Sequence, residues 1–205
     1  MSKWINRRFG TARGLVRSAL AHAELFSGRL SQFGLHNPEK VERLVFVCLG
    51  NICRSAYGHQ IAAGLGLSVA SLGLSTTTGV GSPEEALASA KRLGVDMDAH
   101  RARDWSDFEV RSGDLFLVME VRQAHELRRR LGKRTDVQVC LLGNWCSPVM
   151  PHLHDPFSLS ADYFDTCFTR IRQATQNLAR SLRSARAPAA TLASTASGPA
   201  ARDFA

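Results

Sequence analysis

Short apolar runs that alternate with helical segments constrain the fold of this chain more than any other feature. The runs predict strands at residues 43–48, 67–72, 114–119 and 136–141, and the segments between and after them predict helices at 54–66, 83–94, 121–132 and 160–183. Short, strongly apolar strands separated by helices indicate parallel βαβ units covered on both faces. The sequence therefore predicts an α/β fold: a doubly wound four-stranded parallel sheet flanked by helices, with ligands at the carboxyl ends of the strands.

Three parts of the chain differ in composition. Residues 41–183 carry the α/β pattern, and Asn37-Pro38 marks the boundary before them. Residues 184–205 are rich in Ala, Ser, Thr, Pro and Arg with few large apolar side chains, which predicts a disordered tail. Residues 1–40 form an N-terminal extension, outside the α/β pattern.

The N-terminal extension reads as a basic amphipathic helix interrupted near Gly10 and Gly14. Three interpretations stay open for it. It packs on the domain or is partly disordered, it lies on an anionic membrane surface or a protein partner, or it is an Arg-rich targeting segment.

The positive charge of the chain lies at its two ends. The formal net charge is +8, but residues 1–43 and 170–205 each carry +5, which leaves −2 for residues 44–169. Because the central residues carry no excess of positive charge, the composition argues against a nucleic-acid-binding groove in the domain. The five cysteines are an odd number and lack the spacing of a secreted disulfide framework, which predicts that the protein is located in the reducing cytoplasm. No stretch approaches the roughly 18 apolar residues that a membrane-spanning helix needs.

Directly after the first strand, the sequence Cys48-Leu49-Gly50-Asn51-Ile52-Cys53-Arg54-Ser55 has the form C-x5-R-S. Backbone N–H groups of a short strand-to-helix loop and the helix N-terminus suit a tetrahedral oxyanion. Arg54 can return to the same cavity and grip two oxygens, and the positive field favours the thiolate of Cys48. Gly50 and Asn51 tolerate the backbone angles of a tight loop. This pattern predicts a phosphate-binding loop that holds a nucleophile.

Val47 to Ser55 resembles the signature V-C-x-G-N-I-C-R-S-P of the low-molecular-weight protein tyrosine phosphatases, with Ala56 in place of the final proline. The resemblance covers roughly residues 43–180. It implies that Cys48 is the nucleophile, that Arg54 clamps phosphate, and that Ser55 and Asn51 support the thiolate and the loop. It also implies that Cys53 can form a reversible disulfide with Cys48.

Phosphoryl transfer to a thiolate also needs a general acid, because the leaving oxygen must be protonated and water must later be activated. Asp155, in the only Asp-Pro pair of the chain, fits the order in which the family carries its acid. His152 and His154 flank it and could tune it, and no companion set of metal ligands is apparent. By the same resemblance, Ser71 and His100 fall where the family steadies the loop Asn; an exposed His100 capping a helix is the alternative.

The region around the predicted substrate slot departs from the family pattern. Phe157 and Ser158 follow the Asp-Pro pair where the family usually has one or two tyrosines. In the loop after the second strand, where the family carries an aromatic residue, this chain has Ser75-Thr76-Thr77-Thr78. An aryl phosphate can still stack on Phe157, but the other wall is smaller and more polar.

The sequence thus predicts a cytoplasmic, metal- and cofactor-independent phosphatase that dephosphorylates phosphotyrosine proteins through a cysteinyl-phosphate intermediate. One alternative is an arsenate reductase of the same fold, for which Cys140 and Cys146 are the candidate resolving pair. Another is a phosphate-binding or regulatory protein that is recruited to a membrane through its basic N-terminal helix.

Overall fold

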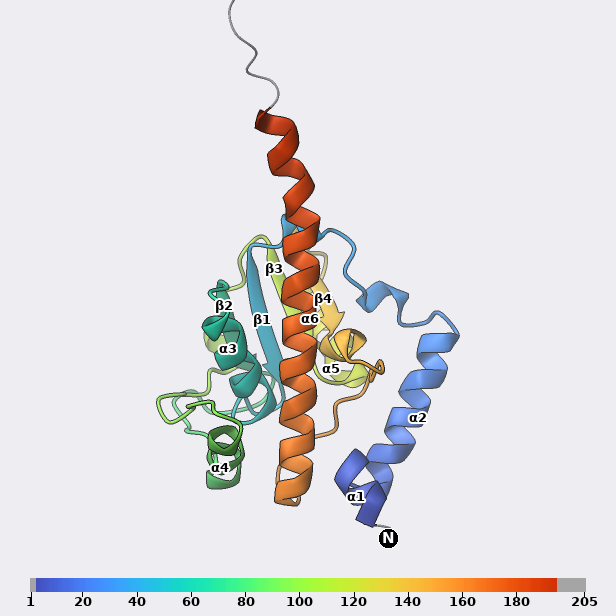
Figure 1. The fold of residues 1–205 in the computed structure, drawn as a ribbon, viewed down its shortest axis with the longest axis vertical. Coiled ribbons are helices and arrows are strands. Elements are labelled where there is room, and N and C mark those ends of the chain that lie inside the picture. The colour runs from blue at the N-terminus through green and yellow to red at the C-terminus, as the bar shows by residue number, and fades with distance from the viewer. Residues whose placement is uncertain (1–2, 195–205) are drawn as a thin grey trace, which may run out of the picture.

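A parallel sheet of four strands forms the centre of the computed structural model, which describes residues 3–194 (Figure 1). The strands are β1 (Arg43–Cys48), β2 (Val69–Gly73), β3 (Asp114–Val118) and β4 (Gln138–Leu141). They lie in the order β2-β1-β3-β4, and each neighbouring pair is parallel. The predicted fold class is confirmed. Because the strand order reverses between β1 and β3, the carboxyl ends of these two strands are where such a fold holds its ligand.

The helices follow the predicted alternation with the strands. The α-helices are α1 (Lys3–Phe9), α2 (Ala12–Phe26), α3 (Arg54–Gly64), α4 (Glu84–Arg92), α5 (Val121–Leu131) and α6 (Ala161–Ser194). Short 3-10 helices are η1 (Ser31–Phe33), η2 (Pro38–Lys40), η3 (Trp105–Asp107) and η4 (Leu142–Trp145).

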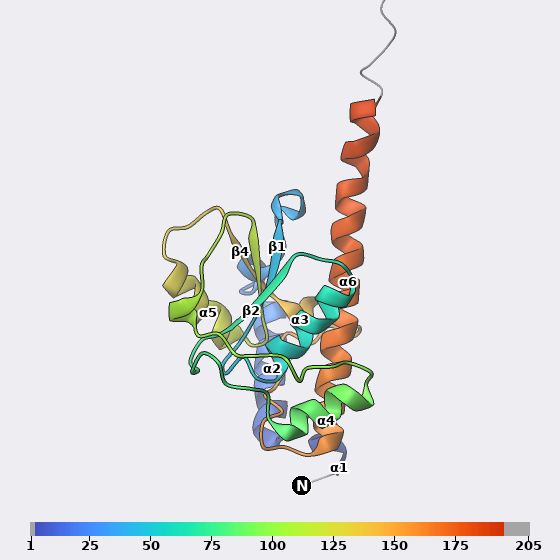
Figure 2. The same cartoon turned by 90° about the vertical axis from the view of Figure 1, so that its left-hand side faces the viewer.

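Alternate residues of β1 point into two separate cores. Leu44 and Phe46 pack on the face that α3 and α6 cover, whereas Val45 and Val47 pack on the face that α5 covers. Figure 2 shows the sheet between α5 on one side and α3 with α6 on the other. Burial on both faces explains why β1 is a continuous apolar run rather than an alternating one. Each fully buried side chain of this size stabilises the fold by about 1.5–3 kcal/mol.

Several predicted boundaries differ from the observed ones by one or two residues, including the start of β4 at Gln138 rather than at residue 136, and the end of the last helix differs by more. The second strand begins at Val69 rather than at residue 67, because the N–H of Leu67 closes the end of α3 by donating to the carbonyl of Ala62. The last helix does not end at residue 183; α6 continues to Ser194, in keeping with the helix propensity of its Ala-rich sequence. The rest of the predicted tail, 195–205, lies outside the described residues, and the division of the chain at residues 40 and 183 stays a prediction.

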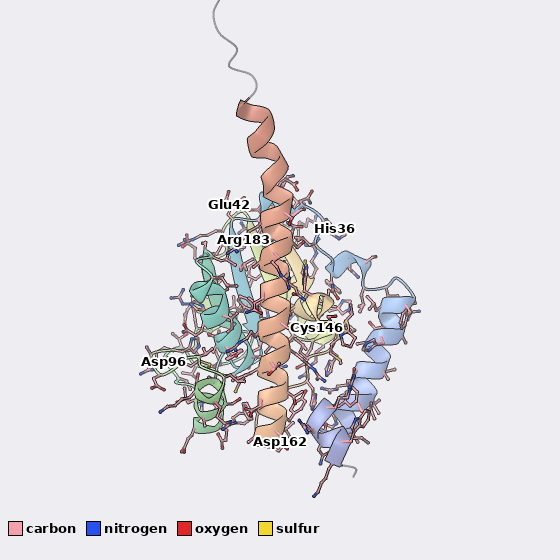
Figure 3. The ribbon with its side chains drawn as sticks, viewed as in Figure 1. His36, Glu42, Asp96, Cys146, Asp162 and Arg183 are labelled. Carbon is pink, nitrogen blue, oxygen red and sulfur yellow. The ribbon has the colours of Figure 1, made fainter. Side chains whose placement is uncertain are left out.

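The N-terminal extension forms two helices that pack against the domain. Gly10 has a φ of +76° and separates α1 from α2, whereas Gly14, the other predicted interruption, lies within α2. Helix α1 contacts α2 and α6, and Figure 3 labels Asp162 at the end of α6 that lies beside α1. Of the three interpretations, packing on the domain is the one found. Between residues 3 and 194, no helix is both long and apolar enough to cross a membrane.

Candidate active site

The nucleophile loop, residues 49–53, joins the carboxyl end of β1 to the start of α3 at Arg54. Asn51 has a φ of +51°, a left-handed conformation that asparagine tolerates better than most residues. Gly73, at the end of β2, lies against the loop: a Cβ there would approach the carbonyl oxygen of Leu49 to 2.9 Å. The tight turn therefore depends on the residue types at positions 51 and 73.

Cys48 is the last residue of β1 and is 3% exposed. Its Sγ lies 3.0 Å from the hydroxyl oxygen of Ser55 and accepts a hydrogen bond of 3.2 Å from the backbone N–H of Asn51. Both predicted supports of the nucleophile, Asn51 and Ser55, are thus in contact with it.

Asn51 is the centre of a buried hydrogen-bond network. Its side-chain amide donates to Ser55 (2.8 Å) and accepts from the backbone N–H of Arg103 (2.9 Å). Nε2 of His100 lies 2.8 Å from its carbonyl oxygen, and His100 is 7% exposed, so the alternative of an exposed His100 does not hold. Ser71 lies in β2, and no hydrogen bond links it to Asn51 among the described residues. The structure brings His100 to the loop but not Ser71.

Arg54 is 1% exposed and is held by groups from two other elements. Its Nη1 donates to Glu120, after β3, at 2.6 Å and to the carbonyl of Leu153 at 3.0 Å. Burial by itself would lower the pKa of Arg54, but the carboxylates of Asp155 and Glu120 raise it. Burial would raise the pKa of Glu120, but Arg54 and Arg122 together lower it to about 2. Both partners are therefore charged at neutral pH.

Asp155 lies in the acid loop, residues 146–160, which links η4 to α6. Its carboxylate forms an ion pair with Nη2 of Arg54 at 2.7 Å, and its side chain is 33% exposed. The N–H of Leu153 anchors the loop to β3 by donating to the carbonyl of Met119 (2.9 Å). The nucleophile loop and Asp155, more than 100 residues apart in sequence, thus meet at Arg54.

The two histidines before Asp155 face the interior side of the acid loop. Nε2 of His152 lies 3.4 Å from Nδ1 of His154. Burial lowers the pKa of His152 to about 4 and also lowers the pKa of His154. Both rings are therefore neutral at neutral pH. Within residues 3–194, no group of three or more His, Cys, Asp or Glu side chains is arranged to hold a metal ion.

The remaining predicted site residues lie around the loop. Leu49 is 44% exposed and Phe157 is 54% exposed, so each presents an apolar side chain to solvent beside the nucleophile and the acid. Gly50 and Ile52 complete the backbone of the loop. Cys53 is a buried free thiol whose pKa burial raises, and it forms no disulfide with Cys48 in this structure.

Sequence reasoning missed Glu120, which holds Arg54 in place. Its signal is an acidic residue directly after an apolar strand that lies next to β1, at the edge where ligands are expected. It also missed the backbone N–H of Arg103, which carries no side-chain signal, and the contact of Thr11 with His154 at 3.1 Å.

The family model described as low molecular weight phosphotyrosine protein phosphatase matches residues 43–187. The chain belongs to this family. Low molecular weight protein-tyrosine-phosphatases are hydrolases, and so is this chain. The nucleophile loop and Asp155 both lie inside the matched segment.

Curated relatives match over nearly their whole length. The probable low molecular weight protein-tyrosine-phosphatase AmsI of Erwinia amylovora is 30% identical over 144 residues, which cover 69% of this chain and 98% of AmsI. Wzb of Salmonella typhi, a low molecular weight protein-tyrosine-phosphatase, is 30% identical over 68% of this chain and 93% of its own length. The family model leaves residues 1–42, and with them the N-terminal extension, unmatched.

Solved structures agree with these relatives. The AmsI tyrosine phosphatase of Erwinia amylovora has a TM-score of 0.58 at 28% identity, covering 69% of this chain and 93% of its own. Wzb of Escherichia coli K30, in complex with sulphate, has a TM-score of 0.59 at 25% identity, covering 69% and 99%. The YwlE arginine phosphatase of Geobacillus stearothermophilus, at 20% identity and a TM-score of 0.63 over 72% and 96%, shares the fold.

Proposed function

We propose that this chain hydrolyses phosphotyrosine in proteins through a cysteinyl-phosphate intermediate. The observation that carries the proposal is that Cys48, Arg54 and Asp155 lie around one point at the carboxyl edge of the sheet. Nε of Arg54 is buried and has no hydrogen-bond partner among the residues that the structure describes. A buried donor without a partner is costly, and an oxygen of a phosphate group would satisfy it.

In the first step, the thiolate of Cys48 attacks phosphorus and the bond from phosphorus to the tyrosine oxygen breaks. Asp155 gives its proton to the leaving phenolate, while Arg54 and the loop N–H groups hold the equatorial oxygens. In the second step, Asp155 takes a proton from water as the water attacks phosphorus. The phosphorus–sulfur bond breaks, which releases inorganic phosphate and restores the thiolate. No metal or cofactor takes part in either step.

Aromatic substrates are favoured by the exposed rim of the site. Leu49 and Phe157 are 44% and 54% exposed, and a phosphotyrosine ring could pack against both. The names of AmsI and Wzb as tyrosine phosphatases support the same substrate class.

An arsenate reductase would need thiols that resolve an arsenylated Cys48. The candidates, Cys140 and Cys146, are both buried, and burial raises the pKa of Cys140 to about 12 and that of Cys146 to about 11. Because the thiolate is the reactive form, such thiols are poor resolving groups.

The experiment is hydrolysis of p-nitrophenyl phosphate, phosphotyrosine peptide and phosphoarginine from about pH 4.5 to about pH 8, with arsenate reduction assayed in parallel. We expect turnover that survives EDTA, vanishes in Cys48→Ser and falls roughly 10²–10⁴-fold in Asp155→Asn. Cys140→Ser is the matched cysteine control and retains phosphatase activity. Arsenate reduction without phosphatase activity would reject the proposal, and a preference for phosphoarginine would reject its substrate class.

We further propose that the enzyme is cytoplasmic and that the outward face of α2 contacts an anionic membrane surface. Val16 and Leu20, one helical turn apart, are 57% and 59% exposed, and Phe26 at the helix end is 86% exposed. Arg13, exposed in the same helix, and the charge of +5 in residues 1–43 complement anionic headgroups. Exposed apolar side chains flanked by arginine are typical of interfacial helices.

Sedimentation with vesicles tests this partner. We expect the full chain to bind vesicles that contain phosphatidylglycerol and not pure phosphatidylcholine, with roughly tenfold weaker binding in the double variant Val16→Ser, Leu20→Ser. Val80→Ser, which removes an exposed valine (44%) outside the extension, is the control. Absence of binding to the anionic vesicles would reject the membrane as the partner.

A further inference from the structure

The inward face of the N-terminal extension consists of small residues that lie directly on the acid loop. Gly10, Gly14, Ser18 and Ala21 are buried there. A Cβ at Gly14 would come within 2.8 Å of the His154 ring, and one at Gly10 within 2.8 Å of Leu159. The backbone of the extension therefore contacts the acid loop on both sides of Asp155, at a distance that larger side chains would not permit.

Polar contacts fix the same surface. The hydroxyl of Thr11, which caps α2, lies 3.1 Å from Nε2 of His154. Further along α2, Ser18 donates to the sulfur of Met150 (3.3 Å), and Nε2 of His22 lies 3.1 Å from the carbonyl oxygen of Val149. The extension thus contacts the acid loop from residue 149 to residue 159, the segment that contains Asp155.

The two neighbours of Asp155 on its N-terminal side connect it to different parts of the molecule. The carbonyl of Leu153 accepts from Arg54 (3.0 Å), which ties the loop to the nucleophile. His154 contacts Thr11 with one ring nitrogen and His152 with the other. Its carbonyl accepts from the hydroxyl of Tyr163 (3.2 Å). His154, which directly precedes Asp155, therefore has its backbone fixed by the domain and its side chain in contact with the extension.

We propose that Thr11 and the small-residue face of the extension position the Asp155 loop for proton transfer. The inference rests on the proposed function, because it assigns Asp155 the role of general acid. The family model begins at residue 43, so the extension lies outside the segment that matches the family. The extension is thus an addition that acts through His154, and Thr11 is a positioning residue that touches neither substrate nor reacting atoms.

The experiment compares two leaving groups in the full chain. A misplaced acid slows phenyl phosphate, whose phenolate needs protonation, more than p-nitrophenyl phosphate, whose phenolate leaves readily. For Thr11→Val we expect kcat/KM on phenyl phosphate to fall about tenfold, part of the roughly 10²–10⁴-fold that a general acid contributes. We compare kcat/KM because it covers only the steps up to release of the phenol, whereas kcat also includes hydrolysis of the intermediate, which both substrates share. On p-nitrophenyl phosphate we expect less than about a twofold change, and Thr11→Ser should restore both values because it keeps the hydroxyl.

Two further variants separate the contact with His154 from the cap of α2. His154→Phe keeps the ring packing and the Thr11 cap but removes both ring nitrogens, and it should reproduce the selective loss. The double variant should lose no more than either single one, because both remove the same contact. Thr166→Val, which removes a threonine hydroxyl on the exposed side of α6, is the matched control and should retain wild-type rates.

An equal loss on both substrates, or no loss in His154→Phe, would overturn the positioning role while the phosphatase proposal stands. Wild-type turnover that does not depend on Cys48 would overturn the phosphatase proposal itself. The two failures are therefore distinct. Should Thr11→Val unfold α2, the comparison of His154→Phe with His152→Phe still decides the question. Both variants keep the cap of α2 and lose the contact between the two histidines, but only His154→Phe loses the contact with Thr11.

Discussion

The nucleophile loop and the acid loop, to which we assign complementary parts of the proposed reaction, are held by different means. Residues 49–53 are fixed from within the domain: Asn51 is fully buried, and its hydrogen bonds join Ser55, His100 and the backbone of Arg103. Asp155 is 33% exposed in its side chain, and the contacts of its loop include the N-terminal extension. Two loops in one site therefore differ in how far their geometry depends on the family domain alone.

This difference indicates which part of the site depends on residues outside the family domain. In the proposed reaction, residues 49–53 bind phosphate and activate sulfur, which requires several donors at once. Their hydrogen-bond network is buried and local. The acid loop must present one carboxylate, and a few supports from outside the domain can adjust it. Four substitutions test the comparison, taken from the largest expected free-energy effect to the smallest.

Arg54→Lys breaks the contact between the two loops. Lysine lacks the planar fork that bonds Glu120, Leu153 and Asp155 at once. We expect kcat/KM on p-nitrophenyl phosphate to fall by on the order of 10³-fold, as for loss of a transition-state anion donor. Arg122→Lys, which changes the exposed partner of Glu120, is the matched control. A loss confined to KM would show that Arg54 binds the ground state and the transition state equally, and would contradict a role specific to the transition state.

Glu120→Gln tests the internal support of Arg54 through stability. The pKa of Glu120 is lowered from 4.5 to about 2 in the folded chain, so its ionised form stabilises the fold by about 3 kcal/mol above pH 4.5. That contribution is lost as the pH falls from about 4.5 to about 2. We expect urea unfolding at pH 7 to give a free energy of unfolding that is lower in the variant than in the wild type by about this amount. The difference between the two proteins should become smaller at low pH. A deficit independent of pH would place the effect in packing rather than charge.

Gly73→Ala tests how tightly the nucleophile loop is packed. A Cβ at Gly73 would lie 2.9 Å from the carbonyl oxygen of Leu49 and must push the loop outward. We expect turnover of both phenyl and p-nitrophenyl phosphate to fall about tenfold, since small displacements of a catalytic group are costly. Gly64→Ala, where an added Cβ meets nothing within 4 Å, is the control and leaves turnover unchanged. A loss limited to phenyl phosphate would contradict the separation of the two loops.

Phe157→Ala sharpens the comparison at the exposed rim. The ring is 54% exposed, so its removal leaves the buried network intact. We expect KM for p-nitrophenyl phosphate to rise a few-fold, in line with roughly 0.5–1.5 kcal/mol for an aromatic pair, with kcat unchanged. Parallel measurement with an alkyl phosphate provides the contrast, because without an aromatic ring it should show no change. Equal effects on both substrates would exclude stacking.

The residues of the nucleophile loop were predictable because they are consecutive. Strand, turn and helix start follow one another from Arg43 to Ser55, so each side chain's direction follows from local geometry. Asp155 was predictable from its Asp-Pro pair and the resemblance. Ser71 was assigned to the same network as His100, but only His100 reaches Asn51, because contact across strands depends on packing that the resemblance does not specify. Glu120 was missed because it lies in no local motif.

Periodicity, and spacing within a few residues, were enough to predict the parallel α/β class and the loop from Cys48 to Ser55. Only the tertiary structure decided that Glu120 and Asp155 meet at Arg54 and that Thr11 reaches His154. These contacts join residues separated by 66, 101 and 143 positions. Which distant side chains touch depends on how whole layers pack, and no pattern within one element encodes that.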